Sequence, residues 1–280
     1  MTSVPDRLFS EAELAAVYDL FNPPDERGDF GFYRPLMTAA PTVLDVGCGT
    51  GAMLHLVRAA RHRGRLVGLD PAEGMITQSR RRADIEWVLG DLSCVAWDRA
   101  FDLVVMTGHA FQVLLTDDEI RVTLAAIHRA LVPGGCFAFE TRNPSARAWE
   151  KWHGYRGKVT DSAGVTVHMT TDVVEPFDGN FVSFTHTYAS GHWREPKVSR
   201  STLRFLDADA LNVFLREAGF SIEAQYGDWN RCAITERSPE IITLARHPVE
   251  IALSSASRAG GGSSACSGRG RWSCPWSRCE

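Results

Sequence analysis

The feature that most constrains this chain is a short apolar run followed at once by three closely spaced glycines and a periodic apolar segment. Residues 42–46 (Thr-Val-Leu-Asp-Val) are typical of a buried strand. Gly47, Gly49 and Gly51 interrupt that run, tolerate positive φ and let a ligand touch bare backbone. The helix expected to begin near Gly51 points unpaired N–H groups at the same place. A strand, a glycine turn and a helix in this order predict a ligand-binding crevice.

Four further apolar runs follow this turn, and helical segments separate them. The runs cover residues 65–70, 85–92, 100–106 and 136–140. Strands that alternate with helices pair in parallel, so the pattern predicts an α/β fold with helices on both faces of a parallel sheet. The carboxyl ends of parallel strands meet at one edge of such a sheet, and ligands bind there.

Two kinds of cofactor fit the glycine turn. Its first two glycines and Ala52 satisfy the dinucleotide pattern Gly-x-Gly-x-x-Gly/Ala, which keeps NAD open as the ligand. Asp70 ends the second run about 20 residues past the turn, where an acid accepts hydrogen bonds from ribose hydroxyls of either cofactor. The third glycine, Gly51, and an acid at Asp45, just before the first glycine, favour a different ligand.

The whole run over residues 43–51, Val-Leu-Asp-Val-Gly-Cys-Gly-Thr-Gly, resembles motif I of the class I S-adenosylmethionine-dependent methyltransferases. Two later motifs agree with this resemblance. Residues 90–92 (Gly-Asp-Leu) resemble the adenine-binding motif of the family, and residues 131–135 (Leu-Val-Pro-Gly-Gly) resemble another of its turns. Shorter runs near Tyr18 and at 107–112, 140–144 and 226–229 are similar to a group of bacterial methyltransferases of unassigned substrate. The layout is most similar to that of enzymes that methylate small metabolites.

The resemblance implies S-adenosyl-L-methionine as the cofactor. In the family, the glycine loop wraps the amino-acid end of the cofactor and the acid before it supports the loop. A carboxylate after the third strand takes the adenine amino group, and an aromatic segment ahead of motif I often closes over the site. The expected cofactor-binding residues are Tyr18, Tyr33, Arg34, Asp45, Gly47, Cys48, Gly49, Gly51, Asp70, Pro71, Met75, Gly90, Asp91, Leu92, Thr107 and Gly108.

Beyond Trp152 the chain changes to segments rich in Val, Thr and Phe that alternate in polarity. The expected antiparallel strands cover residues 164–175, 180–188 and 197–205. A helix over 207–218 and strands over 221–226 and 240–245 then return to the main fold. The resemblance implies a Rossmann-like seven-stranded sheet with an antiparallel last strand and an antiparallel β insertion after the fifth strand.

These patterns divide the chain into five expected parts. They are an N-terminal helical lid segment (1–40), an S-adenosylmethionine-binding core (41–155), an antiparallel β insertion that caps the substrate (156–205), the return of the core (206–248) and a disordered tail (249–280). The tail consists largely of Ser, Gly, Arg and Cys without hydrophobic periodicity, so little offsets its ordering entropy.

Methyl transfer depends mainly on aligning donor and acceptor, because the sulfonium is already activated. His109, just past the fourth strand, is expected at the carboxyl edge and is the candidate general base. A loop histidine bonded to backbone is the competing interpretation. The expected substrate-binding residues are His109, Gln112, Glu140, Arg142, Trp149 and Trp229, and the insertion is expected to cover a small-molecule acceptor.

Composition weighs against several classes of partner. A net charge of −4 and a pI near 6.1 give no electrostatic footprint for nucleic acid. No apolar run approaches the length of a membrane span, and the N-terminus lacks a signal pattern, so we expect a cytoplasmic protein. The seven cysteines include no pair with the spacing of a metal or redox motif, so we expect no metal.

The sequence therefore predicts an S-adenosylmethionine-dependent methyltransferase that acts on a small-molecule acceptor by N- or O-methylation. Three alternatives stay open: a methyltransferase of RNA or protein, an NAD-dependent oxidoreductase, and a non-catalytic binding protein with the methyltransferase fold. The sequence does not indicate an oligomeric state.

Overall fold

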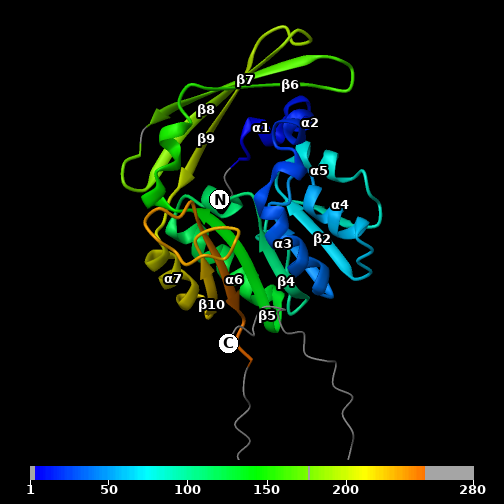
Figure 1. Cartoon of the computed structure of the whole chain (residues 1–280). Coiled ribbons are helices and arrows are strands. Elements are labelled where there is room, and N and C mark those ends of the chain that lie inside the picture. Colours follow the sequence, from blue (N-terminus) through cyan, green and yellow to red (C-terminus); the bar gives the residue numbers. More distant parts are fainter. Residues whose placement is uncertain (1–3, 176, 250–280) are drawn as a thin grey trace, which may run out of the picture.

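Seven strands form the main sheet of this protein (Figure 1). The computed structural model describes residues 4–175 and 177–249. In spatial order the strands are β10 (Ser221–Tyr226), β11 (Glu240–Arg246), β5 (Leu131–Arg142), β4 (Phe101–Met106), β1 (Thr42–Val46), β2 (Arg65–Asp70) and β3 (Glu86–Leu89). β11 runs antiparallel to both of its neighbours, and the other pairs are parallel. The prediction of a seven-stranded sheet with an antiparallel last strand is confirmed.

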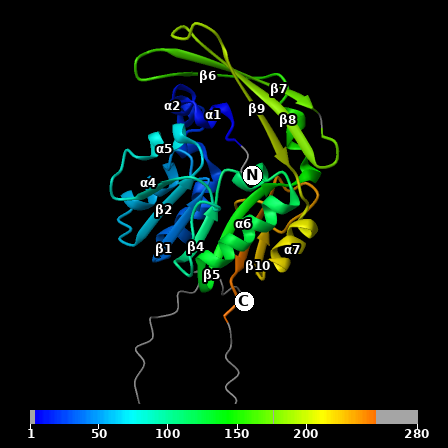
Figure 2. The ribbon, with the colours of Figure 1, turned by 180° about the vertical axis from the view of Figure 1, so that it is seen from behind.

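Helices cover both faces of this sheet, because its central strands send buried side chains alternately to each face. Val43 of β1 packs in a cluster with Leu54, whereas the next residue, Leu44, packs in a second cluster with Leu124. α3 and α4 therefore lie on one face and α6 and α7 on the other (Figure 2). The helices are α1 (Arg7–Ser10), α2 (Ala12–Phe21), η1 (Pro24–Glu26), α3 (Gly28–Ala39), α4 (Ala52–Ala59), α5 (Glu73–Ser79), η2 (Ala110–Val113), α6 (Asp117–Ala130), η3 (Pro144–Ala146), η4 (Ala148–Lys151) and α7 (Ala208–Glu217).

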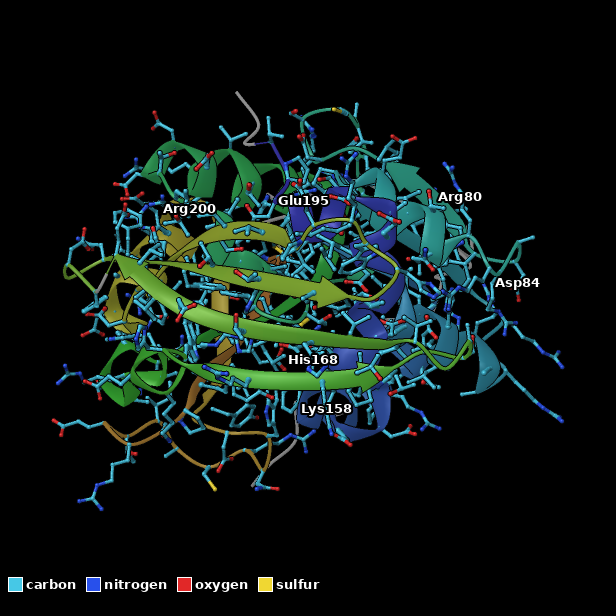
Figure 3. All side chains as sticks on the ribbon, turned by 90° about the horizontal axis from the view of Figure 1, so that it is seen from above. Arg80, Asp84, Lys158, His168, Glu195 and Arg200 are labelled. Atoms are coloured by element: carbon cyan, nitrogen blue, oxygen red, sulfur yellow. The ribbon has the colours of Figure 1, made fainter. Side chains whose placement is uncertain are left out.

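A second, antiparallel sheet arches over the carboxyl edge of the first (Figure 1). Its strands, in order, are β6 (Tyr155–Thr160), β7 (Thr166–Glu175), β8 (Phe181–Ser190) and β9 (Lys197–Arg204). Viewed from above, it lies across the molecule, with Lys158 and His168 on its strands β6 and β7 (Figure 3). His168 is exposed, whereas its neighbours Val167 and Met169 are buried against the N-terminal helices. The predicted antiparallel insertion is confirmed, with β6 as a strand that the sequence pattern did not predict.

The N-terminal helices and the inserted sheet are joined to each other. The backbone N–H of Leu8 donates to Oγ of Ser199 at 2.8 Å, and Oγ of Ser201 donates to Asp6 at 2.5 Å. Lys197 of β9 forms ion pairs with Glu11 and Glu13. These contacts make α1, α2 and the inserted sheet into one roof over the sheet edge.

Two segments differ from the expected pattern. β5 begins at Leu131, because that residue pairs with Phe101 of β4, so the predicted turn over 131–135 is the start of the strand. The aromatic segment before motif I forms the helix α3, with Pro35 inside it.

Within the described residues, no helix is long and apolar enough to cross a membrane. The same part of the chain holds no group of three or more side chains arranged to bind a metal ion. The predicted tail lies outside the described residues, apart from Val249.

We predict that Gly68→Ala lowers the free energy of unfolding by about 1–3 kcal/mol, the usual cost of overpacking. A Cβ at Gly68, in the middle of β2, would lie 2.6 Å from the ring of Trp87 and 2.8 Å from Sγ of Cys48. The Trp87 ring is held in place, since its Nε1 donates to the carbonyl of Arg82 at 2.9 Å. Denaturant titration measures the difference.

Gly31→Ala is the matched control for this prediction. Gly31 lies within α3, and a Cβ there would have no atom within 4 Å. The same substitution should therefore stabilise the protein by about 0.5–1 kcal/mol, the helix preference of Ala over Gly. Equal stability of the Gly68→Ala variant and the unmodified protein would show that Trp87 is free to move aside.

Candidate functional site

A cavity of about 660 Å³ lies between the carboxyl edge of the main sheet and the roof. From the sheet edge it is lined by Asp45, Gly47, Cys48, Gly49, Thr50, Asp70, Pro71, Met75, Thr107, Gly108, His109 and Arg142. From α1, α2 and the inserted sheet it is lined by residues that include Tyr18, Phe184, His186 and Tyr188. The structure therefore brings together residues from all three parts of the chain around one space.

The glycine loop after β1 takes a conformation that side chains would prevent. Gly47 and Gly51 have φ values of 74° and 73°. A Cβ at Gly47 would lie 2.9 Å from the side chain of Ala110, and one at Gly51 would collide with the ring of Trp87. The backbone of this loop consequently faces the cavity directly, next to the start of α4.

Asp70, at the end of β2, fixes the position of this loop. Its Oδ2 accepts from the backbone N–H of Gly49 at 2.9 Å, and its Oδ1 accepts from that of Ala72 at 2.8 Å. Burial raises the pKa of Asp70, while these two N–H groups oppose the increase. The carboxylate thus ties the glycine loop to the turn that follows β2.

Asp45, in β1, is a buried acid that lines the same cavity. It is 1% exposed, and its Oδ1 has no hydrogen-bond partner among the described residues. Burial raises its pKa to about 7, with Asp70 adding to the increase and Arg27 opposing it. Since buried polar atoms are rarely left unpaired, this oxygen fits an N–H donor of a bound ligand.

His109 lies at the cavity in a chain of hydrogen bonds that are buried or part-buried. Its backbone N–H donates to Oε1 of Glu140 at 2.8 Å, and the hydroxyl of Tyr33 donates to Oε2 of Glu140 at 2.5 Å. Its Nε2 is 2.9 Å from Oε2 of Glu240. Burial lowers the pKa of His109 to about 3 and raises that of Glu240 to about 7, so the imidazole is neutral at neutral pH.

Arg142, at the end of β5, also lines the cavity. Its Nη1 donates to Oε1 of Gln112 at 3.0 Å, and its guanidinium lies 5.2 Å from the ring centre of Trp152. The Nε2 of Gln112 donates to the carbonyl of Arg204 at 3.0 Å. Gln112 thereby uses its amide to hold η2, β5 and β9 together.

Several predicted site residues do not line this cavity. Tyr33 is fully buried between α3 and the sheet, where it bonds to Glu140, and Arg34 is exposed on α3. Trp149 packs on Phe205 inside the inserted layer. The other predicted residues outside the lining are Gly51, Gly90, Asp91, Leu92, Gln112, Glu140 and Trp229.

These residues lie outside the cavity lining for different reasons. Gln112 and Glu140 are buried and already hydrogen-bonded to protein groups. Oδ1 of Asp91 accepts from the backbone and hydroxyl of Ser93, beyond the end of β3. Trp229 packs on Phe32 of α3. The cavity lining therefore gives no support to Tyr33, Arg34, Gln112, Glu140, Trp149 and Trp229 as ligand contacts.

Sequence reasoning missed two important residues, Glu240 and Arg27. Glu240 begins β11, and because that strand is antiparallel its first residue lies at the carboxyl edge of the parallel strands. The predicted antiparallel direction of this strand was enough to place Glu240 at that edge. Arg27 lines the cavity and pairs with Asp29 at 2.5 Å, but it lies between two helices and carries no sequence signal.

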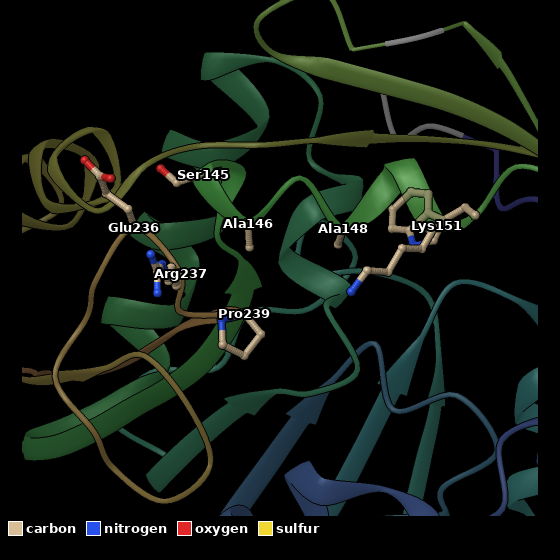
Figure 4. Close-up of a pocket in the computed structure, with 8 residues that line it drawn as sticks. Ser145, Ala146, Ala148, Lys151, Glu236, Arg237 and Pro239 are labelled. Carbon is tan, nitrogen blue, oxygen red and sulfur yellow. The ribbon is translucent and has the colours of Figure 1, made fainter.

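A second, shallower cleft of about 530 Å³ lies beside η3 and η4 (Figure 4). Its charged side chains, Lys151, Glu236 and Arg237, are all exposed. It holds none of the buried acids or the glycine loop, so we assign the chemistry of this protein to the larger cavity.

Comparison with known proteins gives a consistent result. Residues 43–135 match the model of a family described as a methyltransferase domain. The cypemycin N-terminal methyltransferase of a Streptomyces species is 33% identical over 147 residues, which are 50% of this chain and 58% of that relative. The dTDP-3-amino-3,4,6-trideoxy-alpha-D-glucopyranose N,N-dimethyltransferase of Streptomyces venezuelae is 32% identical over 138 residues, covering 46% of this chain and 57% of that relative. The chain thus spans little more than half the length of these curated relatives.

The fold has a similar counterpart among solved structures. The CcbJ methyltransferase from Streptomyces caelestis superposes with a TM-score of 0.68 at 21% identity, covering 88% of this chain and 100% of that one. The family match lies over β1 to β5, the strands that carry the glycine loop, Asp70 and His109. Residues 43–135 therefore form a methyltransferase domain, and the chain shares the fold of a known methyltransferase structure.

Proposed function

We propose that this protein transfers the methyl group of S-adenosylmethionine to a nitrogen of a small-molecule amine. The observation that carries the proposal is the single cavity of about 660 Å³ shared by the glycine loop and the inserted sheet. That volume lies within the range of small-molecule sites. The names of the two curated relatives, an N-terminal methyltransferase and an N,N-dimethyltransferase, support nitrogen as the methylated atom.

The residues around the glycine loop fit this cofactor. The unpaired Oδ1 of Asp45 would accept from its amino group, and Asp70 would accept from its ribose hydroxyls. Met75 is buried and lines the cavity, where it would pack on the adenine. Gly90, Asp91 and Leu92 remain the proposed contacts of the adenine edge. When bound, the cofactor supplies an activated methyl group on a sulfonium.

The chain itself contributes alignment and exclusion of water. Fixing two reactants in a productive geometry can lower a barrier by about 7–11 kcal/mol. The roof of α1, α2 and the inserted sheet covers the sheet edge, and Tyr18, Phe184 and Tyr188 give it an aromatic inner surface. A covered cavity favours a small-molecule acceptor. An RNA or a folded protein would need an open groove instead.

His109 is the proposed catalytic residue because it lines the cavity as a neutral imidazole. Glu240 orients the ring through Nε2, so Nδ1 remains to accept a hydrogen bond from the N–H of the acceptor. A neutral ring at this point does not repel a positively charged sulfonium. Glu240 is a positioning residue in this proposal, since it acts through His109.

We predict that Asp70→Ala lowers the affinity for S-adenosylhomocysteine at least about a hundredfold, because charge-assisted hydrogen bonds contribute about 1.5–3 kcal/mol each. Isothermal titration calorimetry gives the affinity. Asp98→Ala is the control, since Asp98 is exposed and outside the cavity. Binding of NAD without binding of S-adenosylhomocysteine would instead support the oxidoreductase alternative.

We predict that incubation with methyl-labelled S-adenosylmethionine and a cell extract places the label in the small-molecule ultrafiltrate. The His109→Ala variant should bind S-adenosylhomocysteine normally and lose most of this transfer. Label retained with protein or RNA would contradict the proposed acceptor class. Cofactor binding without any label transfer would support a non-catalytic binding protein.

The buried pair of His109 and Glu240 predicts a pH dependence of stability. Burial holds the pKa of Glu240 near 7, above the ordinary value of 4.5, so the folded state binds its proton more tightly than the unfolded state. The contribution of this bound proton to the free energy of unfolding is complete below about pH 4.5 and is lost as the pH rises through about 7. The free energy of unfolding of the unmodified protein should fall by on the order of 2–3 kcal/mol between pH 5 and pH 8. In denaturant titrations the Glu240→Gln variant should not show this decrease.

Glu86→Gln is the control for this measurement, because Arg65 lowers the pKa of the Glu86 carboxyl and that group does not titrate between pH 5 and pH 8. A Glu240→Gln variant with the same pH profile as the unmodified protein would mean that Glu240 is ionised when folded.

A further inference from the structure

Arg142 is a cavity-lining cation that forms no ion pair with an acid among the described residues. Its side-chain hydrogen bond goes to Gln112, a neutral amide, and its guanidinium lies over the ring of Trp152. Within residues 4–175 and 177–249 it forms no ion pair with a carboxylate, although burial lowers its pKa and makes its charge costly. A guanidinium in this situation has N–H donors available to a bound ligand.

The acids that act on His109 and Arg142 are already bonded to or paired with other groups. Asp29 forms an ion pair with Arg27 at 2.5 Å. Glu140 accepts from Tyr33 and from the backbone of His109. Glu240 is bonded to the ring of His109. Among the described residues, Arg142 is therefore the arginine of the cavity lining that forms no ion pair, although Glu240 and Glu140 attract its charge from farther away.

The side chains around Arg142 are held in place. Gln112, which accepts from Arg142, is 1% exposed and donates to the carbonyl of Arg204. The charge of Arg142 also acts on His109, since it helps to lower the pKa of that imidazole. Arg142 and His109 line the same cavity, and so do the aromatic side chains of Tyr18 and Tyr188.

We infer that the acceptor carries an anionic group, a carboxylate or a phosphate, which Arg142 holds while the methylated nitrogen lies beside His109. This inference rests on the proposed function, and it restricts that function to amines that also bear a negative charge. The planar guanidinium presents parallel N–H donors that match either anion in a two-point contact. The aromatic roof then covers the part of the acceptor between its two polar ends.

The test uses the full chain saturated with S-adenosylhomocysteine and titrated with acetate, inorganic phosphate or the neutral probe acetamide at constant ionic strength. Calorimetry reports binding, and the tryptophan fluorescence of the chain, to which Trp152 beside Arg142 contributes, is a second readout. We expect saturable binding of at least one anion and none of acetamide. Arg142→Gln should weaken anion binding at least tenfold and leave the affinity for S-adenosylhomocysteine within threefold.

Arg200→Gln is the matched control. Arg200, labelled in Figure 3, also lines the cavity, but its guanidinium is paired with Glu175. This variant should bind the anions as the unmodified protein does. Arg142→Lys serves as a second variant that keeps the charge without the two-point geometry, and it should retain only part of the anion affinity.

The outcomes separate the two proposals. Binding of acetate alone identifies a carboxylate acceptor, and binding of phosphate alone identifies a phosphate ester. Anion binding that survives Arg142→Gln would overturn the inference, as would no anion binding at all. A loss of S-adenosylhomocysteine affinity beyond tenfold in Arg142→Gln would assign Arg142 to the carboxylate of the cofactor and overturn it too. Failure of the unmodified protein to bind S-adenosylhomocysteine would instead refute the proposed function.

Discussion

The carboxylate of Asp70 is the contact on which the site depends. Its two oxygens accept from backbone N–H groups on opposite sides of the crevice, one in the glycine loop and one after β2. A buried acid is costly unless such donors compensate it. The same pairing that compensates Asp70 sets the shape of the glycine loop. The strand order, with β1 beside β2, is what brings these groups within reach of one carboxylate.

The roof is the second requirement, because a sheet edge alone is an open crevice. It is built from segments far apart in the sequence, α1 with α2 and the inserted strands β7 to β9, and they are joined through Ser199, Ser201 and Lys197. The loop is also tied to the roof, since the hydroxyl of Thr50 donates to Asp19 of α2 at 2.7 Å. The contacts of the N-terminal helices therefore join the glycine loop and the inserted sheet to the same roof.

The local sequence pattern was sufficient to predict much of the fold. The strands β2 and β10 have the expected ends, because β2 is a largely apolar run and β10 alternates polar and apolar residues. The helix α3 was not predicted, since Gly28, Gly31 and Pro35 are poor helix formers and burial of its apolar face outweighs their preference. β6 has exposed side chains at most of its positions, so it lacks the alternation that identifies a strand.

The sequence likewise predicted some residues of the site and missed others. Residues after predicted strand ends, such as Asp70 and His109, lie at the cavity as the topology requires. Arg27 could not be predicted, because it lies in no motif and reaches the cavity only through the packing of α2 and α3. Conversely, Glu140 near the end of β5 and Gln112 in η2 after β4 point into the protein, where they hold His109 and Arg142. Sequence position gives the edge of the sheet, and packing decides which side chains face the ligand.

The most direct test of this account is a crystal structure of the full chain with S-adenosylhomocysteine bound. The account predicts the amino group of the ligand at Oδ1 of Asp45, its ribose at Asp70 and its sulfur facing His109 beneath the inserted sheet. A ligand that leaves Asp45 unpaired, or that lies outside the cavity between the glycine loop and the roof, would contradict it.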